Sequence, residues 1–165
     1  MKNLLMTVIL LATAALSAGE LKIKADYFES DQAKNIAVFK GNVNIKKKND
    51  ELNATKVVVY TDKQRHPVKL VATGDVSFKI KDEHGKRYRG KAKKVIYLPK
   101  KQEYRFFTDV HLHQLGEKKE IIGDEVIFNA LTGKARARSR KNNPVVMIFD
   151  IKEKNTTTTD KSHKK

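Results

Sequence analysis

Cysteine is absent from the 165-residue chain, which excludes both a disulfide framework and a thiolate metal site. The chain also lacks a Gly-x-Ser-x-Gly motif, a phosphate-cradling Gly-rich loop and a His-Glu-x-x-His motif. His111 and His113 share one face of a predicted strand, but a zinc site needs three or four ligands. We therefore expect no catalytic residues, no metal site and no cofactor.

No apolar run is long enough to cross a bilayer, which takes roughly 20 residues. The N-terminal run from Leu4 to Leu16 follows Lys2 and precedes Ser17-Ala18-Gly19, a pattern typical of a cleaved signal peptide. We expect residues 1–18 to be removed and the mature chain to be periplasmic. An uncleaved membrane anchor is the alternative.

Acidic residues are few, since 19 Asp and Glu face 35 Lys and Arg, a formal net charge of +16. Such a field attracts polyanions, and export argues against nucleic acid and for a phosphate-rich envelope lipid. Basic residues occupy alternate positions at Lys134, Arg136, Arg138 and Arg140. They are either phosphate contacts or part of a solvated outer face.

Helical periodicity is missing too, and the apolar residues instead alternate with polar ones in short segments from Gly19 to about Ile151. The segment from Leu70 to Ile80 is the clearest example. This pattern predicts an all-β domain over residues 19–151. Residues 152–165 contain no apolar side chain and are predicted to be a disordered Lys/Thr-rich tail.

Twelve apolar positions recur in these segments and are predicted to share the inner face of the strands. They are Val43, Ile45, Val57, Val59, Val76, Phe78, Val95, Tyr97, Val110, Leu112, Val126 and Phe128. Alternation alone favours the ordinary core of a closed sandwich over the lining of an apolar groove.

A weak internal repeat underlies the strands. Gly41-Asn42-Val43, Gly74-Asp75-Val76 and Thr108-Asp109-Val110 recur at spacings of 33 and 34 residues. Repeats of this length are typical of stacked supersecondary units that bury one continuous core.

The order of three motifs resembles the LptA (OstA-like) family of periplasmic lipopolysaccharide-transport proteins. These are the opening Leu21-Lys22-Ile23-Lys24-Ala25-Asp26, then Ala37-Val38-Phe39-Lys40-Gly41-Asn42-Val43, then Ala72-Thr73-Gly74-Asp75-Val76. The resemblance implies an open, twisted, V-shaped β-jellyroll of stacked antiparallel strands. It also implies that the twelve apolar residues hold the acyl chains of lipid A.

The resemblance further implies head-to-tail homo-oligomers that bridge inner-membrane LptC-like and outer-membrane LptD-like proteins through edge strands. The predicted edges are Leu21 to Ala25 and Val145 to Ile151. Two other functions stay open: an anchored LptC-like subunit, and an exported structural or polysaccharide-binding β protein. Two acidic-x-Asn-x-Thr motifs, at residues 51–55 and 153–157, are candidate glycosylation sites.

Overall fold

The computed structural model describes residues 20–140 and 143–151. Residues 1–18, predicted as the signal peptide, and residues 152–165, predicted as the tail, lie outside the described residues. The second glycosylation motif, at residues 153–157, lies outside them as well. The first motif lies in a strand.

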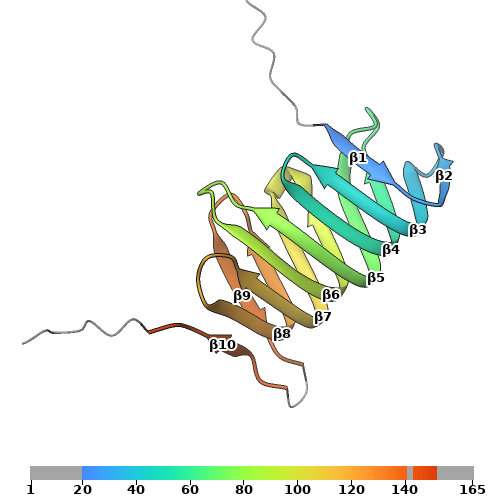
Figure 1. Cartoon of the computed structure of the whole chain (residues 1–165). Helices are drawn as coiled ribbons and strands as arrows, with labels where there is room; N and C mark the ends of the chain where they lie inside the picture. Colours follow the sequence, from blue (N-terminus) through green and yellow to red (C-terminus); the bar gives the residue numbers. More distant parts are fainter. Residues whose placement is uncertain (1–19, 141–142, 152–165) are drawn as a thin grey trace, which may run out of the picture.

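The described residues form one antiparallel sheet and contain no α-helix, which confirms the predicted all-β fold (Figure 1). The elements are β1 (Leu21–Lys24), β2 (Tyr27–Asp31), β3 (Ile36–Lys47), β4 (Asp50–Thr61), β5 (Pro67–Lys81), β6 (Arg87–Leu98), the 3-10 turn η1 (Pro99–Lys101), β7 (Glu103–Gln114), β8 (Lys119–Asn129), β9 (Lys134–Arg138) and β10 (Val146–Ile148).

The strands pair in the order β1-β3-β4-β5-β6-β7-β8-β10, and consecutive hairpins connect the long strands β3 to β8. Each end of the sheet carries two short strands. β1 and β2 pair with different halves of β3, and β9 and β10 pair with different halves of β8.

The sequence repeat marks β-bulges. Gly41-Asn42 in β3, Gly74-Asp75 in β5 and Thr108-Asp109 in β7 each lie where the strand register shifts. All six residues have positive φ, from 44° at Asn42 to 83° at Gly74. A bulge of two residues in the left-handed conformation bends and twists a strand. The strands β3, β5 and β7 therefore each bend at their bulge, and the three bends lie in one row across the sheet.

These bends fold the sheet into two facing walls. We call residues 27–40, 56–73, 94–107 and 125–138 wall A, and residues 21–24, 43–54, 76–92, 110–123 and 146–148 wall B. Figure 1 shows the N-terminal strands at one end of the folded sheet and the C-terminal strands at the other.

A row of valines lies along the inside of the bend. Each side chain is at most 1% exposed, and the row consists of Val43, Val57, Val76, Val95, Val110 and Val126. Val43, Val76 and Val110 follow the bulges directly. β-Branched side chains suit strands, and their burial between the walls explains why valine recurs in the repeat.

Aromatic rings close the middle of the interior. Phe78 of wall B stacks on Phe106 of wall A with ring centroids 4.4 Å apart, and Tyr88 of wall B meets Phe128 of wall A at 4.7 Å. Gly90 leaves room for the Phe78–Phe106 contact, since a Cβ at residue 90 would lie 2.6 Å from Cζ of Phe78. The V is therefore packed shut in its centre.

Candidate functional site

The interior opens at the end formed by β1, β3 and β4. There the walls leave an apolar hollow of about 50 Å³ that is open to solvent. We call it the N-terminal pocket. Its lining consists of Leu21, Ile45, Lys47, Asp50, Glu51, Leu52, Val57, Leu70, Ala72, Ile80, Val95, Tyr97 and Tyr104.

Small side chains line part of this pocket. Val57, Ala72, Val95 and Phe106 face the interior in one row across wall A, on β4 to β7. The first three line the N-terminal pocket, whereas Phe106 stacks on Phe78 of wall B.

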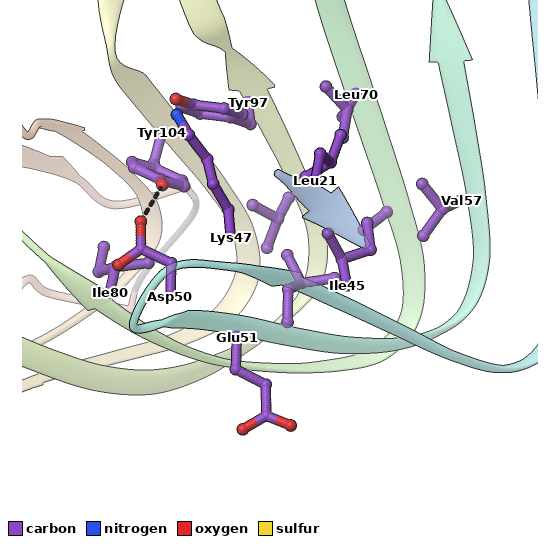
Figure 2. Close-up of a pocket in the computed structure, with 13 residues that line it drawn as sticks. Leu21, Ile45, Lys47, Asp50, Glu51, Val57, Leu70, Ile80, Tyr97 and Tyr104 are labelled. Atoms are coloured by element: carbon purple, nitrogen blue, oxygen red, sulfur yellow. Dashed lines mark hydrogen bonds between the residues drawn. The ribbon is translucent and has the colours of Figure 1, made fainter. Parts of the chain in front are cut away.

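Polar groups gather at one side of this pocket (Figure 2). The hydroxyl of Tyr104 donates to Oδ2 of Asp50 at 3.4 Å, and the backbone N–H of Lys81 donates to Oδ1 at 2.8 Å. The Tyr97 ring stacks on Tyr104, with 4.4 Å between centroids, and Nζ of Lys47 lies 5.9 Å from the Tyr97 centroid. The pocket is thus apolar in its depth and polar at this side.

Burial perturbs both members of the Tyr104–Asp50 pair. Loss of solvent raises the pKa of Asp50, and burial followed by the charge of Asp50 raises the pKa of Tyr104 far above its ordinary value. Tyr104 therefore stays neutral at physiological pH. It serves as a hydrogen-bond donor that ties wall A to the β3–β4 hairpin of wall B.

All twelve apolar residues predicted for the groove lie on the inner face. Eleven belong to the buried core and Tyr97 packs against it. Only Ile45, Val57, Val95 and Tyr97 line the N-terminal pocket. The remaining eight are Val43, Val59, Val76, Phe78, Val110, Leu112, Val126 and Phe128. Contact with lipid stays a prediction for all twelve residues.

A second opening, the C-terminal pocket, lies between the walls at the other end of the sheet. Leu112, Phe128 and β10 contribute to its lining. The side chains of β10 are 42–52% exposed. The interior is thus accessible from both ends.

Nine pocket residues were not among the predicted site residues, namely Leu21, Lys47, Asp50, Glu51, Leu52, Leu70, Ala72, Ile80 and Tyr104. Leu70, Ala72 and Ile80 share the alternation that identifies the inner face of β5. The alternation along β5 was therefore sufficient to predict that these three residues face the interior. Nothing local distinguishes pocket residues from packed ones, because the distinction depends on the opposite wall.

The basic stripe projects from the outer surface. Ala135 and Ala137 are paired with inward-facing Phe128 and Val126, so Lys134, Arg136 and Arg138 face away from the interior. Arg140 follows β9 and is exposed, and its backbone N–H donates to Oδ2 of Asp124 at 2.7 Å. A role in phosphate contact stays a prediction for these four residues.

Two searches concern the described part of the chain alone. No group of three or more His, Cys, Asp or Glu residues within 20–140 and 143–151 is placed to hold a metal ion. Within the same ranges, no helix has the length and apolar character needed to span a membrane.

The bent antiparallel sheet and its apolar interior define an open β-jellyroll. A model of the family described as "LptA/(LptD N-terminal domain) LPS transport protein" matches residues 22–134, more than half of the chain. The chain therefore belongs to this family. The predicted family membership is confirmed.

A solved structure shares the fold. It is the crystal structure of LptH, described as the LptA homologous periplasmic component of the conserved lipopolysaccharide transport device from Pseudomonas aeruginosa. The match covers 80% of this chain and 96% of that chain, with 15% identity and a TM-score of 0.71. A search of the curated proteins finds no match.

Proposed function

We propose that this chain transports lipopolysaccharide in the periplasm and shelters lipid A acyl chains between its two walls. The observation that carries the proposal is the N-terminal pocket, an apolar hollow between the walls that is open to solvent. Burial is worth about 25 cal/mol per Å² of apolar surface, so an acyl chain gains by leaving water for such a space. Family membership supports the same cargo.

Photo-crosslinking tests this placement. A photoreactive residue at Leu52, which lines the pocket, is expected to crosslink to lipopolysaccharide in cells. Asn53 is the matched control, because it is the next residue on β4 and donates to the Ser77 hydroxyl on the outer face. Equal labelling from both positions would show that lipid does not enter between the walls. It would favour surface adhesion, as in a polysaccharide-binding β protein.

We propose further that the sheet extends head to tail into a bridge through its two ends. Antiparallel sheets accept additional strands at free edges, and β1 and β10 are short strands that leave such edges. One end would receive an inner-membrane LptC-like partner and the other an outer-membrane LptD-like partner.

An anchored LptC-like subunit is the competing role within the same pathway. The two roles differ in the fate of residues 1–18. The mass of the native protein decides between them: loss of about these residues supports the periplasmic carrier, and an intact N-terminus in the membrane fraction supports the anchored subunit.

A further inference from the structure

Lys47, the last residue of β3, places its charged ammonium group beside the N-terminal pocket. Alternation along this strand places Val43, Ile45 and Lys47 on the inner face, and the neighbouring Lys46 on the outer face. Lys47 is the one basic side chain among the described residues that line the N-terminal pocket. A charged end at this position is unexpected on a face that is otherwise apolar.

The ammonium group of Lys47 has no carboxylate partner within 4.0 Å among the described residues. It lies over Tyr97, at 5.9 Å from the ring centroid. Asp50 lies across the hairpin, where its charge interacts with that of Lys47, and Tyr104 and the Lys81 backbone donate hydrogen bonds to its two oxygens. Glu51 points away from the pocket (Figure 2) and pairs with Lys46 at 3.6 Å. Lys47 is therefore available to an incoming anion.

Lys47 also lies at a boundary between two spaces. Beside the apolar pocket is a polar space, the polar mouth, that shares Lys47, Asp50, Tyr97 and Tyr104 with it. The other residues of the polar mouth are Lys48, Asn49, Lys81, Asp82, Glu83, Gly85, Gln102 and Ala130.

Two of the carboxylates in the polar mouth already accept hydrogen bonds from within the protein. Asp82 accepts hydrogen bonds from its own turn and from the Tyr88 hydroxyl, and Asp50 is held as described above. Glu83 is exposed to solvent. An amphiphile would thus have its chain in the apolar pocket and its headgroup in the polar mouth, with Lys47 at the junction.

We propose that Lys47 binds the phosphate, or an equivalent anionic group, of an amphiphile whose acyl chain occupies the N-terminal pocket. This assignment rests on the proposed function and adds to it a headgroup contact inside the V. Lys134, Arg136 and Arg138 cannot make the same contact, since they project from the outer surface. A hydrogen bond in which the donor or the acceptor is charged is roughly twice as strong as one between neutral groups.

The test compares Lys47→Gln with Lys46→Gln in the full chain. Lys46→Gln is the matched control because it removes the same charge from the next residue on the outer face. The probes are bisphosphorylated lipid A, dephosphorylated lipid A and inorganic phosphate. Charge-assisted hydrogen bonds contribute about 1.5–3 kcal/mol, so Lys47→Gln should weaken binding of the phosphorylated form by about 10-fold or more. Binding of the dephosphorylated form should not change.

Each outcome decides one question. Equal affinity of Lys47→Gln and the wild-type chain for phosphorylated lipid A overturns the assignment, while leaving acyl-chain binding intact. Competition by inorganic phosphate as strong as by lipid A indicates a plain anion site, and also overturns it. Failure of the wild-type chain to bind either form of lipid A contradicts the proposed function itself. Restored affinity in Lys47→Arg supports a charge contact.

Discussion

Phe78 and Phe106 stack across the interior, with 4.4 Å between ring centroids, although they lie on β5 and β7 and therefore on strands that are not hydrogen-bonded neighbours. The contact joins wall B to wall A in the middle of the sheet. Gly90 on the intervening strand leaves room for the Phe78 ring. This pair separates the two open ends of the interior.

Replacing Phe106 with alanine should destabilise the fold by about 3–5 kcal/mol, because a fully buried ring is lost and a cavity remains. Phe106 is 0% exposed. Urea unfolding measures the change. Phe107→Ala is the matched control, because Phe107 is the next residue on β7, lies partly exposed on the outer face and contacts Lys94. Similar losses for both variants would mean that the walls do not pack against each other.

Gly74→Ala should also destabilise the protein, for two reasons that can be separated. Gly74 has φ 83°, and an added Cβ would lie 2.5 Å from Oγ1 of Thr55. Gly116 has nearly the same φ, 84°, with nothing within 4 Å of an added Cβ. Gly116→Ala should therefore cost only the left-handed backbone strain, about 1–2 kcal/mol. Gly74→Ala should cost more, and equal thermal shifts would contradict the close packing at the bend.

Asp50 gives the fold a defined pH dependence. Because burial raises its pKa in the folded state, the folded chain binds this proton more tightly than the unfolded chain. The contribution of Asp50 to stability therefore falls as the pH rises from the ordinary Asp range through the raised pKa. The Asp50→Asn variant has no carboxyl group at this position and so does not titrate there. Its free energy of unfolding relative to wild type should increase with pH across that range.

Asp75 supplies a control of opposite sign. The ammonium group of Lys93 hydrogen-bonds to Asp75 at 2.6 Å and lowers its pKa. Asp75 therefore contributes stability above the ordinary Asp pKa, and that contribution is lost as the pH falls through the lowered value. Asp75→Asn should lose stability relative to wild type as the pH rises. Parallel pH curves for the Asp50 and Asp75 variants would exclude the assigned causes.

Truncation tests the C-terminal edge. Removing residues 145–165 deletes β10 and leaves Glu120, Ile121 and Ile122 of β8 paired with β7 alone. We expect self-association, measured by sedimentation velocity, to weaken. We also expect crosslinking to one of the two membrane partners to weaken. The control removes only residues 152–165 and retains β10. Unchanged association after the longer truncation would assign the interface elsewhere.

Much of the fold follows from local features of the sequence. Alternation predicts the long strands and the inner face, and the three-residue repeat coincides with the bulges at Gly41, Gly74 and Thr108. Thr108 departs from glycine, yet its φ is 64°. The pairing of β7 with β6 and β8 on both sides of the bulge holds this bend, although residue 108 is not a glycine.

The sequence by itself determined the strands, their periodicity and the family, because side-chain alternation and short motifs are properties of a few adjacent residues. Only the tertiary structure decided which inner residues are packed and which are open, because that depends on contacts between walls. Tyr104 and Asp50, 54 residues apart, meet only when the sheet is bent. Likewise, alternation places Lys134, Arg136 and Arg138 on a common face, but only their pairing with β8 shows that this face is the outer one.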